Sequence, residues 1–276
     1  YYVYSYGGSF FQSLESCKEY NSSCSESNRV KLASAGDKMY WKIVRVNGDG
    51  SLRLIYNGIS SLPTNHGLTN SYLIGIAPYN LNWNDPKYTG YTYDNGTDSF
   101  IKREIETWYE NSLGDTIYDS MVIGGRFCSD SSGYQTGNTF GIDYIFSSMI
   151  RLAQVYTDYY TSNAPTLICP TTDETYGGSY RLKAGLITAD ELALAGESFY
   201  VTGTGYLSEG TLTLSYWTMT PADLANGYAG TWRERSYLRY DDVGSNNNGI
   251  RPVINVITDN GFASGDGTAS NPYVIE

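Results

Sequence analysis

The amino-acid sequence predicts an α+β fold with two helices and mostly antiparallel strands. Runs of β-branched and aromatic residues separated by turn residues predict the strands, and apolar residues at helical spacing predict the helices. Four cysteines indicate that disulfides stabilise the fold. The 276 residues contain no repeat and no low-complexity linker. We therefore expect one domain over 37–276, preceded by an N-terminal extension over 1–36 that holds an edge strand and a disulfide-closed loop.

The strongest β signal is "YWKIVRVNGDGSLRLIYNG", residues 40–58. Two runs rich in β-branched and aromatic residues flank the turn residues "NGDG". The pair Asn47 and Gly48 supplies the positive φ angles that a tight hairpin turn requires. The segment therefore predicts an antiparallel hairpin.

The first helix is predicted in "SFIKREIETWYENSLG". Its apolar face holds Ile101, Ile105, Trp108 and Tyr109, and Gly114 is a natural stop. The opposite face carries the charged residues of an ordinary solvated surface: Lys102, Arg103, Glu106 and Glu110.

The second helix is predicted in "AGLITADELALAG". Thr188 and Glu191 have the spacing of a capping box, which satisfies two backbone donors at a helix start. Gly196 follows as the C-terminal cap.

Turn residues divide the rest of the chain. We expect irregular structure at 57–98, and loops with one short helix at 120–170. Strands are expected at four further places: 198–203, 210–221, 231–240 and 249–257.

The cysteines are Cys17, Cys24, Cys128 and Cys169. Their spacing and the single histidine argue against a zinc site. The close pair in "CKEYNSSC" favours the disulfides Cys17–Cys24 and Cys128–Cys169, although four cysteines allow three connectivities. Disulfides imply an oxidising compartment, and four free thiols in a cytosolic protein are the alternative.

Composition restricts the partners. A formal net charge of -11 repels a phosphate backbone, so nucleic acid is not expected. No run approaches the roughly 20 apolar residues of a membrane-spanning helix. The chain begins without Met, so we expect a processed, exported protein that is extracellular or on the cell surface.

Catalysis has no positive signal in the sequence. The one histidine, His66, lies in a "TNHGL" loop without a nucleophile motif. Candidate carboxylates for glycoside hydrolysis are better explained as helix surface and capping residues: Glu104, Glu106, Asp190 and Glu191. We predict that the chain is not an enzyme, and a carboxylate-based glycosidase is the alternative within the enzyme class.

No cofactor is expected. The oxygen-rich turns "NGDGS", "NWNDPK", "YDNGTD" and "DDVGSNNN" could offer ligands to calcium, but no EF-hand loop is present. Ordinary turn chemistry explains most of them, so the calcium hypothesis rests on oxygen counts alone.

Recognition is the function that the composition favours, because Tyr, Ser, Gly and Asn are typical of binding loops on rigid scaffolds. We expect the ligand-binding face within 217–249. Its predicted residues are Tyr228, Trp232, Arg233, Arg235, Tyr237, Arg239, Tyr240, Asp242, Asn246, Asn247 and Asn248. Alternation along one strand would place Trp232 on one face and Arg233 on the other. The alternative to a binding face is an ordinary polar antiparallel strand with one face in solvent.

Several segments together resemble a known family. In chain order they are "NGDGSLRLI", "PTLICP", "GLITADELALAG", "YWTMTP", "GIRPVINV" and "GTASNPYVI". They look like the C-type lectin-like domains of bacterial, Firmicutes-type surface proteins, over roughly 37–276. The same fold is used by variable proteins of diversity-generating retroelements, whose changeable positions lie near the C-terminus beside an invariant framework. The resemblance implies a display surface in 223–248, followed by framework at Gly249 and 251–256.

The sequence also departs from that family. Sugar-binding members carry a Glu-Pro-Asn or Gln-Pro-Asp loop and a Trp-Asn-Asp strand, whereas here "NWND" lies at 82–85, before the first predicted helix. Calcium-dependent sugar binding is therefore not implied. The sulfatase-activating members use a reactive cysteine pair, and no cysteine follows Cys169.

The expected function is recognition of a protein or glycan partner by an extracellular, non-enzymatic domain. The rival is a structural subunit of a pilus or surface filament. In that case the N-terminal strand would complete a neighbour's sheet, and the tyrosines would serve self-assembly.

Overall fold

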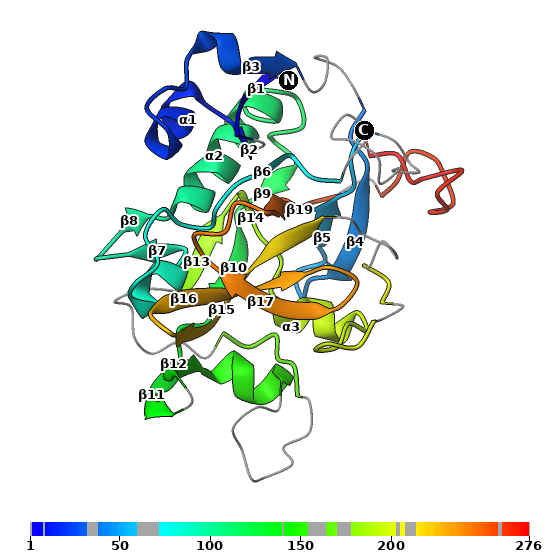
Figure 1. Cartoon of the computed structure of the whole chain (residues 1–276). Helices are drawn as coiled ribbons and strands as arrows, with labels where there is room; N and C mark the ends of the chain where they lie inside the picture. Colours follow the sequence, from blue (N-terminus) through cyan, green and yellow to red (C-terminus); the bar gives the residue numbers. More distant parts are fainter. Residues whose placement is uncertain are drawn as a thin grey trace.

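The computed structural model describes residues 2–7, 9–31, 38–59, 72–139, 141–153, 164–169, 178–202, 205–207, 214–258 and 261–275. His66 lies outside this part of the chain. The predicted α+β class and its mostly antiparallel sheets are confirmed (Figure 1). In the described residues, no helix is long and apolar enough to cross a bilayer.

The larger sheet has seven strands in the order β11-β12-β15-β16-β17, and β18 joins β15 and β6 beside that path. Among the strand pairs of this sheet that the structure describes, only β15–β18 is parallel. Its strands are β6 (Gly75–Ile76), β11 (Gly133–Thr139), β12 (Ile142–Phe146), β15 (Ser215–Ala225), β16 (Tyr228–Glu234), β17 (Leu238–Asp242) and β18 (Asn248–Ile250).

The smaller central sheet has five strands in the order β14-β19-β5-β4, and β9 also pairs with β19. Its strands are β4 (Trp41–Val46), β5 (Leu52–Tyr56), β9 (Val122–Ile123), β14 (Ala184–Gly185) and β19 (Val253–Val256). Two-stranded ribbons pair β10 (Gly125–Ser129) with β13 (Gly178–Leu182), and β7 (Thr92–Tyr93) with β8 (Thr97–Asp98).

The predicted hairpin at 40–58 is confirmed, since β4 and β5 pair in antiparallel register from Trp41↔Tyr56 to Val46↔Leu52. Its turn differs from the expectation. The residue with positive φ is Gly50, at 86°, and not Asn47 or Gly48. The Asp49 carboxylate accepts hydrogen bonds from the backbone and hydroxyl of Ser51, which stabilises a longer turn.

Both predicted helices are confirmed. They are α2 (Phe100–Ser112), capped by Ser99, and α3 (Ala189–Leu194), which begins with the capping box of Thr188 and Glu191. Gly196 follows α3 with a φ of 102°. The prediction of a solvated face on α2 is wrong for Lys102, which is buried and forms ion pairs with Asp98 and Glu106.

The prediction of two helices was too low. The described residues also contain α1 (Leu14–Tyr20) and a π-helical turn, η4 (Met149–Ala153). Short 3-10 turns occur at η1 (Glu26–Asn28) and η3 (Pro86–Thr89). The sequence of α1 was interpreted as a loop because its seven residues are too few for a clear apolar period.

The N-terminal residues form a small sheet of their own. The expected edge strand is a hairpin of β1 (Tyr2–Tyr6) and β2 (Ser9–Phe11), and β1 is the middle strand because it also pairs with β3 (Arg29–Lys31). These strands and α1 lie together beside α2 (Figure 1). Phe11 is fully buried against Phe100, with ring centroids 5.9 Å apart.

Both predicted disulfides, Cys17–Cys24 and Cys128–Cys169, are confirmed. The loops expected at 120–170 are wrong where this region forms strands. That region contributes β9 to β12, and the one short helix expected there is η4. Its polar, glycine-containing strands lack the alternating apolar pattern on which the prediction depended.

Two predicted strands are corrected in the C-terminal half. The described residues of this stretch, 198–202, form a turn around Tyr200, whose φ is 54°, with only isolated bridges. The expected single strand at 231–240 is a second hairpin, β16 and β17, which reverses at 235–237 around Ser236 with a φ of 60°. Neither Tyr nor Ser is a usual residue for this conformation, so the turns have no clear sequence signal.

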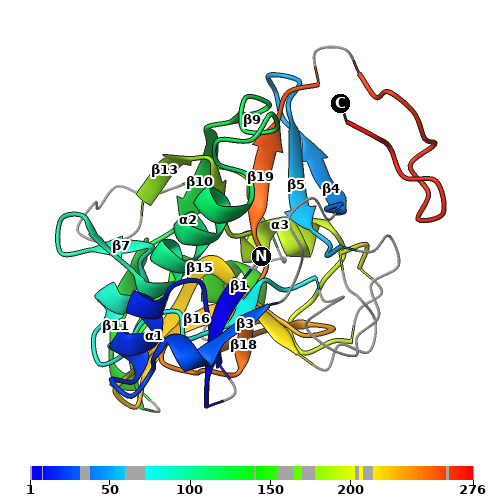
Figure 2. The same cartoon turned by 90° about the horizontal axis from the view of Figure 1, so that it is seen from above.

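The segment 248–256 connects the two central sheets. β18 belongs to the larger sheet and β19 to the smaller one. Between them, the fully buried Arg251 donates from Nε to the carbonyl of Tyr56 at 2.8 Å and from Nη2 to Asn57 Oδ1 at 3.0 Å. Gly249 was expected to make an unusual turn, but its backbone is ordinary strand. A Cβ there would lie 2.3 Å from Leu73 Cδ1, so close packing is what requires glycine. Beyond β19, residues 261–275 extend away from the sheets (Figure 2).

Candidate functional site

The most distinctive exposed feature lies where β16 turns into β17. We call Tyr200, Arg235, Tyr237 and Arg239 the hairpin-end surface. The Tyr200 ring stacks on Tyr237, with centroids 5.7 Å apart and planes 27° apart. The Arg239 guanidinium lies over the Tyr200 ring, 5.4 Å from its centroid. Tyr200 remains 52% exposed in spite of both contacts, so the layered side chains face solvent.

The backbone holds the Tyr200 turn beside β17. Leu238 donates to the carbonyl of Ser198 at 2.9 Å, and Tyr200 donates to the carbonyl of Leu238 at 3.1 Å. Two short turns, both containing a residue in the left-handed region, are thereby fixed side by side. A non-glycine residue in that conformation costs about 1–2 kcal/mol, which the surrounding contacts must offset.

Aromatic packing supports this surface from below. Phe199 contacts Trp232 with centroids 5.5 Å apart and stacks on Tyr240 at 6.2 Å. Trp232 was expected to bind ligand, but it is fully buried, and its indole N–H donates to Ser148 Oγ at 2.9 Å. This prediction is corrected, because Trp232 is a supporting residue of the core. Tyr240 is half-buried.

Arg233 is also buried, although it was expected on an exposed face. It is 6% exposed, and its ion pair with Asp241 spans 3.5 Å from Nε to Oδ2. Its Nε and Nη1 atoms have no hydrogen-bond partner. Burial lowers the pKa of Arg233, and the neighbouring charges of Arg239 and Arg235 lower it further, while Asp241 raises it.

The predicted ligand-binding residues do not form one surface. Tyr228, which is 47% exposed, starts β16, whereas Arg235 follows its end. The exposed Asp242 pairs with Gly230 near the start of β16, as the β16–β17 register requires. Beside this end lies Trp83, 46% exposed, whose carbonyl accepts from the backbone of Ala229 at 2.6 Å.

The asparagine run divides in the same way. Asn247 is exposed, and Asn246 donates to the hydroxyl of Tyr20 at 2.5 Å, which ties the loop after β17 to α1. Asn248 is fully buried: it accepts from Ser215 and donates to Asp241 Oδ2 at 3.0 Å. Asn248 is therefore a structural residue, contrary to its prediction as a binding residue.

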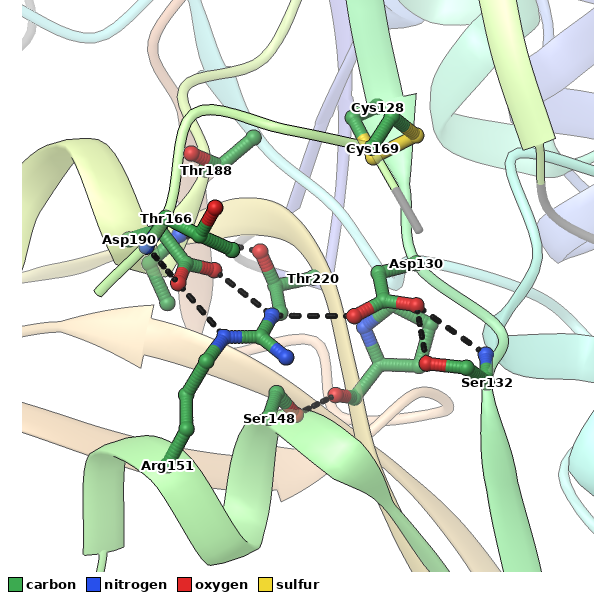
Figure 3. A network of polar contacts seen from close by, with 12 residues as sticks. Cys128, Asp130, Ser132, Ser148, Arg151, Thr166, Cys169, Thr188, Asp190 and Thr220 are labelled. Carbon is green, nitrogen blue, oxygen red and sulfur yellow. Dashed lines mark hydrogen bonds and ion pairs between the residues drawn. A yellow bond between two sulfur atoms is a disulfide. The ribbon is translucent and has the colours of Figure 1, made fainter. Parts of the chain in front are cut away.

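A second polar cluster lies below the sheet, around Arg151 of η4 (Figure 3). The guanidinium donates to both carboxylate oxygens of Asp190, at 2.6 and 2.9 Å, and forms an ion pair with Asp130 at 2.9 Å. Asp190 also accepts from the backbone of Thr166 at 2.9 Å, and Asp130 accepts from Ser132. All three charged groups are mostly buried, and the Cys128–Cys169 disulfide lies alongside (Figure 3).

This cluster joins four chain segments, and its one cation compensates part of the charge of the two carboxylates. Neither Arg151 nor Asp130 was singled out from the sequence, because each acts through partners that are distant along the chain. The geometry indicates a structural role.

Four carboxylates were predicted to be helix-surface and capping residues. This is corrected for Glu104 and Asp190, which are buried, whereas Glu191 is the predicted capping residue and is also buried. Glu191 forms ion pairs of 2.5 Å with Arg45 and with the buried Arg53, in addition to its capping role. Glu106 is partly exposed and pairs with Lys102.

Glu104 has no cation in its immediate contacts among the described residues. It accepts from the backbone of Gln12 at 2.6 Å and from the hydroxyl of Ser16. Burial raises the pKa of Glu104 to about 7, against the lowering effect of these hydrogen bonds. Glu104 therefore joins the N-terminal segment to α2.

One carboxyl pair bears on the glycosidase alternative. Asp223 and Asp242 both pair with Gly230 across neighbouring strands, so their side chains share one sheet face. Burial, followed by the charge of Asp242, raises the pKa of Asp223 to about 7. Asp223 Oδ2 has no hydrogen-bond partner.

A hollow of about 190 Å³ lies elsewhere, between α1 and α2, and is lined by Ser13, Glu15, Ser16, Arg103, Glu106 and Thr107.

Among the residues placed by the structure, no group of three or more His, Cys, Asp or Glu side chains could hold a metal ion. The oxygens of Asp49, in the turn "NGDGS", serve the backbone and hydroxyl of Ser51 as described above.

The comparisons with known proteins add no relative. No protein-family model, no curated protein and no solved structure matches this chain. The function must therefore be argued from the geometry alone.

The sequence reasoning missed one residue of the exposed surface, Tyr200. Its segment, "SFYVTG", was interpreted as a strand on its β-branched and aromatic residues. The glycine two residues after Val201 was the one indication of a turn.

Proposed function

We propose that this chain is an extracellular, non-enzymatic binding domain of the C-type lectin-like kind, which contacts a protein or glycan partner through the hairpin-end surface. The observation that carries the proposal is the stack of Tyr237, Tyr200 and Arg239, in which Tyr200 and Arg239 are exposed, beside the half-buried Phe199 and Tyr240 and the buried Trp232. Tyrosine and arginine dominate the energetics of protein interfaces, and a fixed side chain loses little entropy on binding.

Two further features support the proposal. The disulfides fit an extracellular location, where such bonds persist. The surface also lies on a rigid support, since every residue of β16 after Tyr228 is buried. Exposed recognition residues on a rigid scaffold are the usual arrangement of a binding site.

The proposal is tested by binding of the full chain to an array of glycans and extracellular proteins. We expect wild-type protein to bind at least one member, and Tyr237→Ala and Arg239→Gln to lose that binding. Tyr118→Ala is the control, because Tyr118 is a 48% exposed tyrosine in the turn after α2 and outside the hairpin-end surface. Binding that survives both hairpin-end substitutions, or the absence of any ligand, would contradict the proposal.

Diversification of the surface is a separate test on the gene. If siblings of this sequence vary by a retroelement mechanism, substitutions should concentrate at exposed positions such as Tyr228, Tyr237 and Asn247. The buried Trp232 and Asn248 should stay constant together with 249–256. Uniform sequences across both parts would favour a fixed adhesin.

The filament alternative requires a free N-terminal strand. In this structure β1 is paired on both sides within its own chain, and Phe11 of β2 is buried in the core. Light scattering of the full chain tests the alternative. A binding domain should remain a monomer or small oligomer, whereas growth into long assemblies that stops on removal of 1–12 would favour the filament.

A further inference from the structure

The hairpin-end surface carries positive charge on an acidic protein. Arg235 and Arg239 are both exposed, and neither has an ion-pair partner within the described residues. The whole chain carries a formal net charge of -11. The two exposed guanidinium groups are therefore available to an anionic group of a ligand.

A third cation lies beneath them. Arg233 and Arg239 are directly opposite in the β16–β17 register. Like charges in this relation destabilise a sheet. Asp241 offsets Arg233 only at 3.5 Å, and two guanidinium nitrogens of Arg233 lack hydrogen-bond partners. A buried charge is screened less than an exposed one, so Arg233 adds to the positive potential above it.

Flat ring faces adjoin these cations. Tyr200 and Tyr237 are stacked beside Arg239, and Tyr200 is half-exposed. Aromatic ring faces carry partial negative charge and attract the polarised C–H groups of a sugar ring, whereas guanidinium groups bind carboxylates with charge-assisted hydrogen bonds.

We infer that the hairpin-end surface binds an acidic glycan, with a sugar ring against Tyr200 and Tyr237 and the sugar carboxylate at Arg235 and Arg239. Arg233 acts from below as a positioning residue through its charge. The inference rests on the proposed function, because it names the ligand class of the same surface. An acidic peptide offers the carboxylate without the ring, so the tyrosine faces favour the glycan.

The test compares a galacturonic-acid oligosaccharide with its methyl ester, which has the same sugar rings but no carboxylate charge, by calorimetry with the full chain. We expect the acid to bind about tenfold or more tightly than the ester, with the preference declining as salt is raised. Arg239→Gln and Arg235→Gln should reduce the affinity for the acid to that for the ester. Arg126→Gln, at an exposed arginine of β10, is the matched control and should bind like wild type.

Arg233→Met separates a charge effect from a loss of structure. The variant should weaken binding of the acid and leave binding of the ester unchanged, which local unfolding would not do. A uniform loss of both probes in a variant that still unfolds cooperatively would overturn the role of Arg233.

Other outcomes separate the ligand class from the function. Equal affinity for acid and ester, lost from both by Tyr237→Ala, would overturn the acidic class and leave the binding surface intact. Tighter binding of polyglutamate than of the acidic sugar would overturn the assignment of a glycan as the ligand. Failure to bind either sugar would overturn the inference, while the array decides the proposed function independently.

Discussion

Arg151 and Arg239 show two opposite environments for the same side chain. The guanidinium of Arg151 lies between the carboxylates of Asp130 and Asp190, buried under the larger sheet. The guanidinium of Arg239 lies over a tyrosine ring in solvent, with no carboxylate paired to it among the described residues. The charge and the N–H donors of Arg151 are engaged by its two carboxylate partners, whereas those of Arg239 are available to a ligand.

The comparison separates structural charge from available charge. Burying an ion is tolerable when its partners neutralise it, and the resulting cluster has little left to offer a ligand. An exposed ion needs no partner, because water solvates it. Whether carboxylates compensate the guanidinium charge therefore distinguishes the two arginines better than residue type or local sequence does.

The largest expected effect comes from breaking the buried cluster. Arg151→Met leaves Asp130 and Asp190 buried without their cation, and we expect a loss of about 3–5 kcal/mol in the free energy of unfolding. Urea denaturation at neutral pH measures it. Arg239→Met is the matched control and should change stability by less than about 0.5 kcal/mol. Similar losses in both variants would remove the distinction between the two sites.

Removing the disulfide beside this cluster should give the next largest loss of stability. The double substitution Cys128→Ser, Cys169→Ser opens a loop with a sequence separation of 41, and the entropy of that loop predicts a loss of about 4 kcal/mol. Cys17→Ser with Cys24→Ser opens a separation of 7 and should cost less, about 2 kcal/mol. Thermal unfolding of both double variants checks the order, which would be reversed if the N-terminal disulfide held the more strained segment.

Glu104 sharpens the comparison, since it is a buried carboxyl without a paired cation in the described contacts. Its pKa of about 7 in the folded chain is above the ordinary value of 4.5. The folded state therefore binds the proton more tightly than the unfolded state does. Its contribution to stability is complete below about pH 4.5 and is lost as the pH rises through 7.

Glu104→Gln keeps the acceptor for Gln12 and removes this titration. We expect the variant to be about 2 kcal/mol more stable than wild type at pH 8, and similar to it at pH 4. Urea denaturation across this range is the measurement, with Glu110→Gln at an exposed position of α2 as control. A pH-independent difference between wild type and Glu104→Gln would show that Glu104 does not titrate in this window.

The smallest expected effect concerns the turn of the hairpin-end surface. Ser236 has a φ of 60°, so Ser236→Gly should relieve backbone strain and raise stability by about 0.5 kcal/mol after the entropy cost of glycine. Ser236→Ala keeps the strain and should give no gain. Chemical denaturation of the two variants distinguishes them, and equal stabilities would mean that the turn is not strained.

Sequence patterns correctly predicted the secondary-structure elements that are determined by residues close together in the chain. The hairpin at 40–58, α2, and the capping box of α3 each depend on residues within one turn or one helical period, and all three are confirmed. Both cysteine pairings are confirmed as well, because the short spacing of Cys17 and Cys24 made one bridge natural and left the other two cysteines together.

Sequence by itself therefore determined the α+β class, the disulfides and the presence of strands within 249–257. Tertiary structure alone decided which polar residues are exposed. Trp232, Arg233 and Asn248 resemble Tyr237 and Arg239 in the sequence, but they are buried because the chain reverses at Ser236 and the segment around Phe199 packs against the hairpin. Burial depends on contacts with distant segments, which no local pattern of residues contains.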